Sequence, residues 1–236
     1  MTISTLADSR HRFTVALAAG IALAVVLIAA NQIGAGTEET ATGAAPVTPA
    51  HSLFTGIPQQ GAALGSPKAP VTLVEYADLQ CPYCGQWARG TLPTLVDRYV
   101  RTGKLRIVFN GLAFVGPDSN TALRTALAAG RHGHLWDVVD GLFVRQGREN
   151  SGWVTDDVIR EVAAGVPGLD AEKLLHERWN NGIAGEIARA AETANTHGIA
   201  STPSFQLGPT GGTLKRLELA SIDPAGIVPS IEEALR

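Results

Sequence analysis

The two cysteines of this chain, Cys81 and Cys84, are two residues apart and constrain the fold more than any other feature. An apolar run rich in β-branched residues, Val71 to Ala77, leads into them. After them, from Pro82 onward, apolar side chains recur at helical spacing. A cysteine pair between a strand and a helix is the setting of a redox-active dithiol. Two cysteines are too few to staple a chain of 236 residues, so a hydrophobic core must stabilise it.

A CxxC motif can be half of a zinc site, a structural disulfide or a redox dithiol. Zinc needs four ligands, and the sequence has no second CxxC and no HxxxH cluster. His132 and His134 form an HxH pair, which we expect to be exposed histidines of a turn between helices rather than metal ligands. A disulfide closing a two-residue loop would constrain the unfolded chain very little. The sequence therefore predicts a redox pair without a metal or a cofactor.

The start of a helix makes the two cysteines chemically unequal. Unpaired N–H groups and the helix dipole favour negative charge there, and Pro82 suits the first helical position because it has no N–H to lose. We predict that Cys81 is the exposed nucleophile and that Cys84, one turn further in, is its buried resolving partner. Tyr83 brings no positive charge near neutral pH. A stabilised thiolate favours the reduced pair and makes the disulfide a better oxidant.

A long uncharged segment precedes this region. Phe13 to Ala30 contains 18 residues without a charge, with two arginines before it and two glutamates after it. The positive-inside rule places residues 1–12 in the cytoplasm, and the length favours a transmembrane anchor over residues 13–33. Small residues at Ala30 and Ala35 leave a cleaved signal peptide open as the alternative. Both interpretations place the rest of the chain outside the cytoplasm.

The remaining sequence reads as a linker and one α/β domain. Residues 34–51 are small and polar and contain proline, as in a flexible tether, and the folded domain is expected over residues 52–236. One short extended segment is expected before Pro70, and Pro93 should kink or split the helix that follows Pro82. Thr155 and Asp170 are predicted helix N-caps. The predicted order is strand 71–77, helix 82–103, strand 105–109, helices over about 118–197, strands 204–207 and 214–219, and helix 224–235.

Composition excludes one class of partner. The net charge is −3 and only 17% of the residues are charged, so we expect no surface that binds a polyanion and no nucleic-acid partner.

A second motif lies far from the first in sequence. Thr202-Pro203-Ser204 leads directly into a short apolar strand, and a proline at such a place is by itself an ordinary edge residue. Together, APVTLVEYADLQCPYC, the helical region and TPSF make residues 52–236 resemble the thioredoxin superfamily. The chain is most similar to DsbA-like thiol:disulfide oxidoreductases of bacterial envelopes, particularly the membrane-tethered actinobacterial and Gram-positive type. The fold implied is a thioredoxin fold with a helical insertion between its βαβ and ββα halves.

The resemblance also implies roles for single residues. Pro203 would be cis and would pack against the cysteine pair, with Pro82, Tyr83 and Thr202 in the substrate-binding surface. Glu75 would be a buried acid beneath the pair that relays the proton of Cys84. The alternative for Glu75 is an ordinary strand residue that faces solvent or forms an ion pair. Asp78 is also close to the pair, but is expected to cap the loop or contact solvent.

The activity implied is that of an envelope oxidase. Reduced exported proteins would be its substrates, and a quinone-linked membrane partner of the DsbB or VKOR type would reoxidise it. The same residues would also serve a reductase or isomerase, and a non-catalytic binding module of the same fold is a third possibility.

Overall fold

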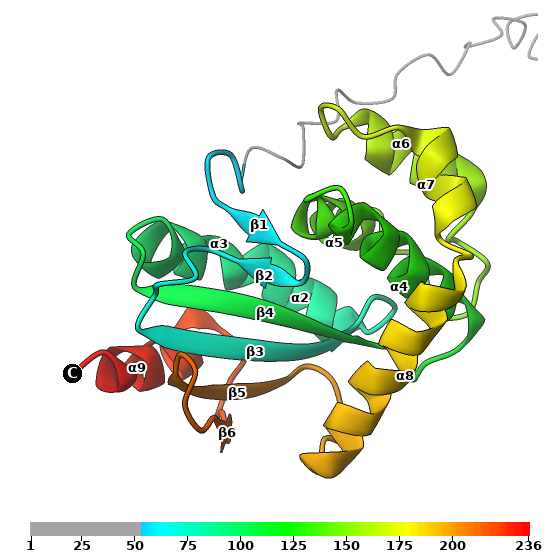
Figure 1. The fold of residues 1–236 in the computed structure, drawn as a ribbon. Helices are drawn as coiled ribbons and strands as arrows, with labels where there is room; N and C mark the ends of the chain where they lie inside the picture. The colour runs from blue at the N-terminus through cyan, green and yellow to red at the C-terminus, as the bar shows by residue number, and fades with distance from the viewer. Residues whose placement is uncertain (1–52) are drawn as a thin grey trace, which may run out of the picture. The chain divides into compact units, whose positions relative to one another are not determined.

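The computed structural model describes residues 53–236, in which six strands form one mixed sheet (Figure 1). The order across the sheet is β1-β2-β4-β3-β5-β6, so β3 lies near its centre, parallel to β4 and antiparallel to β5. The strands are β1 (Gln59–Gln60), β2 (Ala63–Leu64), β3 (Val71–Asp78), β4 (Leu105–Leu112), β5 (Ser204–Pro209) and β6 (Lys215–Leu217).

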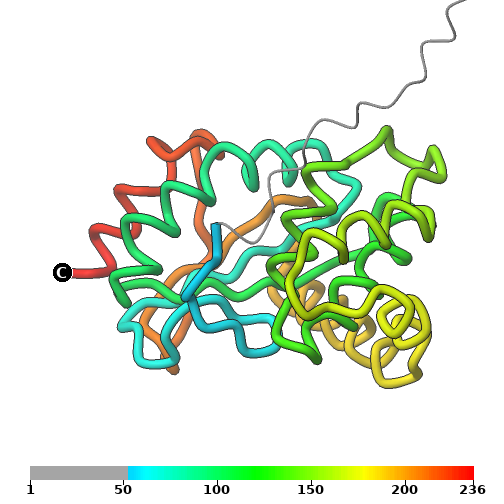
Figure 2. Tube along the Cα trace, turned by 90° about the horizontal axis from the view of Figure 1, so that it is seen from above, coloured from blue at the N-terminus to red at the C-terminus, as the bar shows by residue number. Residues whose placement is uncertain are grey.

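The helices follow the order along the chain that the sequence predicts. They are α2 (Pro82–Gly90), α3 (Leu92–Leu95), the π-helical turn η2 (Val96–Val100), α4 (Pro117–Gly130), α5 (Leu135–Val144), α6 (Asp156–Ala164), α7 (Ala171–Glu177), α8 (Asn181–Thr196) and α9 (Pro224–Ala234). Figures 1 and 2 together show α2 and α3 on one side of the sheet and α8 on the other. The predicted α/β architecture is therefore confirmed, with helices α4 to α8 inserted between a βαβ half and a ββα half.

Strand β3 is a buried central strand that leads directly into the cysteine pair. Seven of its eight residues are buried, because it lies between β4 and β5 and is covered by helices. The chain leaves its carboxyl end directly into the cysteine pair, and Pro82 is the first residue of α2. The predicted break near Pro93 is also confirmed: α2 ends at Gly90, and the proline lies in the first turn of α3, where its missing N–H costs little.

Local signals in the inserted helices are confirmed by their hydrogen bonds. The Thr155 side chain accepts from the N–H of Val158 at 3.2 Å, and Asp170 accepts from the N–H of Lys173 at 3.0 Å. These caps satisfy backbone donors that the first helical turn leaves free. Helix α7 ends at Glu177, and Asn180 then caps α8.

The segment before β3 differs from the prediction. Instead of one extended segment it forms a small hairpin, β1 and β2, which turns at Gly61 with φ +57°. The hairpin adds β2 to the outer side of β4. Strand β4 runs three residues past its predicted end and stays paired with β3 to the last residue of that strand.

The predicted membrane anchor or signal segment (13–33), the cytoplasmic terminus (1–12) and the linker (34–51) lie outside the described residues. Over residues 53–236, no helix is both long and apolar enough to cross a membrane.

Candidate active site

Cys81 is the N-cap residue of α2 and is covered by the loop that precedes β5. Its backbone is extended (φ −66°, ψ 120°), and its N–H donates to the carbonyl oxygen of Asp78 at 3.0 Å. The Cys81 thiol donates to the carbonyl oxygen of Thr202 at 3.3 Å. The residue is 7% exposed and Cys84 is fully buried. Cys81 is the more accessible of the two cysteines, as predicted. It is nevertheless buried rather than exposed, because the Thr202 loop covers its sulfur.

The antiparallel pairing of β3 and β5 brings the second motif to the first. Tyr76, near the end of β3, is opposite Ser204, the first residue of β5, so the preceding Thr202–Pro203 loop reaches the cysteines. The Thr202–Pro203 peptide bond is cis, as the resemblance implies.

The two thiols have opposite pKa shifts. The hydrogen bond with the Cys84 side chain is the largest influence on Cys81 and lowers its pKa to about 6, against the opposing effect of burial. The Thr202 side chain and the backbone N–H groups of Cys84 and Tyr83 lower the pKa of Cys81 further. Burial raises the pKa of Cys84 well above its ordinary value, and the hydrogen bond with Cys81 and the charges of Cys81 and Glu75 add to the rise.

We therefore expect one cysteine to be half ionised near pH 6 in the reduced protein. The ultraviolet absorbance of the thiolate, followed against pH, should show this transition in the full-length protein. The transition should disappear in Cys81→Ser and persist in Cys84→Ala at a higher pH, because alanine removes the hydrogen bond from residue 84. A single transition near the ordinary thiol value of 9.0 in the wild type would contradict the assignment.

Glu75 lies in the middle of β3, between Phe109 of β4 and Phe205 of β5 in the strand register. It is 1% exposed, and its Oε1 atom has no hydrogen-bond partner. Burial raises its pKa well above the ordinary value of 4.5, so the carboxyl group favours its protonated form. The alternative of a solvent-facing or ion-paired strand residue is therefore wrong. The structure puts an unpaired acid within electrostatic reach of Cys84.

Asp78 is fully buried and organises the loop around the cysteines. Its Oδ1 accepts from the N–H of Gln80 at 2.8 Å, and its Oδ2 accepts from the N–H groups of Phe114 and Val115 at 2.7 and 3.0 Å. Of the two roles expected for Asp78, the loop cap is correct and the solvent contact is wrong.

Three side-chain amides that the sequence did not reveal also contact this loop. Gln146, in the turn after α5, donates to the carbonyl oxygens of Leu79 and Cys81, and Gln80 exchanges hydrogen bonds with Asn150. No motif spacing links Gln146 or Asn150 to a cysteine more than sixty residues away, and Gln80, although next to Cys81, belongs to no motif. Only the packing of the inserted helices against α2 reveals them.

The surface beside the pair is apolar. Pro82 is exposed, and Tyr83 and Phe114 are large apolar side chains that are 63% and 48% exposed. Pro82, Tyr83 and Thr202, the residues that the resemblance assigns to substrate binding, all lie in or against the CxxC segment.

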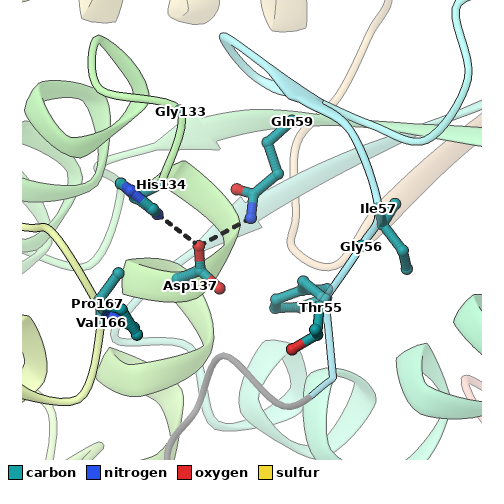
Figure 3. A pocket seen from close by; sticks show the side chains of 10 residues that line it. Thr55, Gly56, Ile57, Gln59, Gly133, His134, Asp137, Val166 and Pro167 are labelled. Atoms are coloured by element: carbon teal, nitrogen blue, oxygen red, sulfur yellow. Dashed lines mark hydrogen bonds and ion pairs between the residues drawn. The ribbon is translucent and has the colours of Figure 1, made fainter.

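The HxH histidines are each engaged with a different acid. His132 pairs with Glu177 at 2.6 Å and His134 with Asp137 at 3.0 Å. His132 is exposed, as expected, whereas His134 is only partly exposed. Figure 3 shows His134 and Gln59 directed at the same Asp137 carboxylate. No group of three or more potential metal ligands occurs within residues 53–236.

The sequence of this chain matches a known protein family and several known proteins. The sequence model of the family described as Thioredoxin matches residues 58–210. A probable disulfide bond formation protein D of Bacillus cereus is 26% identical over 144 residues, which cover 60% of this chain and 67% of that protein. A Na(+)/H(+) antiporter NhaA 3 of Salinispora tropica is 33% identical over 143 residues, but the match spans only 20% of its length and 60% of this chain.

A solved structure supports the same fold. The crystal structure of oxidised BdbD from Bacillus subtilis superposes with a TM-score of 0.66 and 22% identity, over 76% of this chain and 97% of that one. The family match covers more than half of the chain and includes both the cysteine pair and the Thr202–Pro203 loop. The chain belongs to the thioredoxin family, as a thiol:disulfide oxidoreductase of the DsbA-like type.

Proposed function

We propose that this protein is an extracytoplasmic oxidase that introduces disulfide bonds into exported proteins through Cys81 and Cys84. The observation that carries the proposal is the unequal pair of thiols, with the pKa of Cys81 lowered to about 6 and that of Cys84 raised. A stabilised Cys81 thiolate stabilises the reduced pair, so the disulfide gives up its oxidising equivalents readily. The disulfide bond formation proteins among the relatives support the same direction.

The proposed reaction starts from the oxidised protein. A substrate thiolate attacks the Cys81 sulfur, the bond between Cys81 and Cys84 breaks, and Cys84 leaves as a thiolate that takes up a proton. A second substrate thiolate then attacks the substrate sulfur of the mixed disulfide. The substrate disulfide forms, and Cys81 leaves as its stabilised thiolate. Two electrons pass to the cysteine pair, and the substrate loses two protons in total.

Glu75 is proposed as the proton donor to Cys84. Its carboxyl is buried, and burial raises its pKa, so it favours the protonated form and can release that proton to a neighbouring thiolate. In the reverse step, when a partner reoxidises the pair, the same carboxylate would accept the proton of Cys84. A quinone-linked membrane protein of the DsbB or VKOR type is the proposed reoxidant.

The location is proposed from the sequence. Residues 13–33 would anchor the protein in the cell membrane or direct its export, and residues 34–51 would tether the domain that begins at residue 52. In intact cells, a membrane-impermeant thiol reagent applied after mild reduction should label Cys81. Labelling that requires lysis would place the domain inside the cell and overturn this part of the proposal.

Oxidative refolding tests the activity itself. The oxidised full-length protein, mixed with a reduced client that contains cysteines, should introduce disulfides and emerge as the dithiol, because electrons flow to the stabilised Cys81 thiolate. Mass spectrometry after thiol alkylation would count the bonds formed. A protein that introduces none would not be an oxidase.

The resting state in cells separates the oxidase from its alternative. Rapid acid quenching and alkylation should find the cysteine pair mostly as a disulfide. A pair found mostly as the dithiol would instead show a reductase or isomerase.

A further inference from the structure

The Gln146 side chain is held at the base of the cysteine loop. Its Nε2 group donates to the carbonyl oxygens of Leu79 and Cys81, each at 3.0 Å. Both donors of the side-chain amide are therefore used, and the two acceptors fix which end of the amide faces the loop. The Cys81 carbonyl also accepts the first hydrogen bond of α2, from the N–H of Gly85 at 3.1 Å.

The other end of the Gln146 amide packs against α2. A Cβ atom built on Gly85 would collide with Oε1 of Gln146 and would lie 2.8 Å from Nη1 of Arg89. The absence of a side chain at Gly85, the residue after Cys84, therefore lets Gln146 approach the helix. Backbone acceptors on one side and the helix surface on the other hold the amide in a single orientation.

A second pair of amides holds the preceding residue. Gln80 is buried, its Oε1 accepts from the N–H of Asn150 at 2.6 Å, and its Nε2 donates to Ser119 Oγ at 3.0 Å and to Asn150 Oδ1 at 3.2 Å. Gln80 and Asn150, with Gln146, form what we call the amide clamp. The clamp ties the inserted helices to residues 79–81, immediately before the reactive turn.

We propose that Gln146 is a positioning residue for the redox pair, because its hydrogen bonds to the carbonyl oxygens of Leu79 and Cys81 hold the backbone at the start of α2, where Cys81 is the N-cap residue. The inference deepens the proposed function and rests on it, since it concerns the same dithiol. Gln146 touches neither sulfur nor substrate. It acts by setting the direction of the first turn of α2.

Hydrogen bonds to a thiolate depend steeply on direction, so a small rotation of this turn changes the stability of the Cys81 anion. The N–H groups of Tyr83 and Cys84 contribute to the lowered pKa of Cys81. The charged or titratable groups around the pair include Glu75, behind Cys84, Asp78, whose carboxylate accepts from the N–H of Gln80, and Arg89 on α2. The Asp78 carboxylate is bonded to N–H groups, and the carbonyl oxygens of Leu79 and Cys81 accept from the side chain of Gln146, so the effect of Gln146 is separable from theirs.

The test compares Gln146→Leu with Gln59→Leu in the full-length protein. Gln59 is a matched control because it also joins the amino-terminal part of the domain to α5 by two hydrogen bonds. It donates to Asp137 at 2.8 Å and accepts from the N–H of Trp136 at 3.0 Å, at the opposite end of that helix (Figure 3). Urea unfolding gives the stability of each variant. Thiolate absorbance against pH gives the pKa of Cys81, and equilibration with reduced and oxidised glutathione gives the oxidising strength.

In Gln146→Leu we expect the thiolate fraction of Cys81 below its pKa to fall by about threefold or more, which is half a pKa unit. The equilibrium constant for oxidation of glutathione by the protein should fall with it, because a less stable thiolate makes a weaker oxidant. Gln59→Leu should lose stability without either change. Equal shifts in both variants, or none in Gln146→Leu, would overturn the proposal.

Gly85→Ala gives a second test if Gln146→Leu does not fold. Its methyl group displaces the Gln146 amide from the helix side, and it should raise the pKa of Cys81 in the same direction. An unchanged pKa in Gly85→Ala would overturn the proposal on its own. A wild-type protein that equilibrates with glutathione but fails to oxidise a client would refute the oxidase function while leaving the role of Gln146 intact.

Discussion

Cys84→Ala is expected to accumulate mixed disulfides between Cys81 and client proteins and to lose catalytic turnover by roughly a thousandfold or more. Without Cys84 no internal thiol remains to resolve a mixed disulfide. The Cys81 thiolate, with its pKa lowered to about 6, is ionised at neutral pH and reacts readily with oxidised partners. Non-reducing electrophoresis of acid-quenched cells should show adducts that disappear on reduction.

The matched variant is Cys81→Ala, which should form no adducts at all. Cys84 would be the remaining thiol, and it is fully buried with its pKa raised by burial, so it is neither accessible nor ionised. Adducts in Cys81→Ala equal to those in Cys84→Ala would reverse the assignment of the two cysteines. An absence of adducts in both variants would remove the catalytic interpretation altogether.

The sequence was informative where structure is decided locally. The strand before the cysteines, Pro82 at the first position of α2, the break near Pro93 and the caps at Thr155 and Asp170 all follow from residue type and near neighbours. Each of these features depends on contacts within a few residues, which is the range over which backbone preference and side-chain capping act. For that reason, the positions of the strands and helices were predicted closely.

Tertiary contacts decided the parts that were not predicted. The cover over Cys81 comes from Thr202, and the three N–H groups on Asp78 come partly from a loop 36 residues away. Gln146 reaches Cys81 across 65 residues. An amide side chain carries no charge pattern or periodic signal, so its role emerges only when α5 packs against α2.

Glu75→Gln is expected to change the pH dependence of stability as well as the rate of thiol exchange. The folded reduced protein keeps a proton on Glu75 that the unfolded chain releases above the ordinary pKa of 4.5. Stability should therefore fall as the pH rises from that value towards the raised pKa of the folded state, by about 1.4 kcal/mol per pH unit within this window. Glutamine does not titrate, so the variant should lose this slope.

Urea unfolding of the reduced protein at a series of pH values measures that slope. Glu192→Gln, on the exposed surface of α8, is the control and should keep the wild-type profile. A Glu75→Gln profile that superposes on the wild type would show that the buried carboxyl does not titrate abnormally. The raised pKa that the proton relay requires would then be absent.

The rate of client oxidation distinguishes a Glu75 that donates a proton to Cys84 from a Glu75 that is merely buried. If Glu75 donates to Cys84 as the disulfide opens, Glu75→Gln should slow client oxidation by roughly a hundredfold, a typical contribution of one general acid. The pKa of Cys81 should change far less, because the groups that lower it are Cys84, Thr202 and backbone N–H donors. A variant that loses the stability slope and keeps its full rate would leave Glu75 as a buried acid without a part in the chemistry. Loss of both would tie the proton on Glu75 to the opening of the Cys81–Cys84 bond, because a structural defect alone would not spare the Cys81 titration.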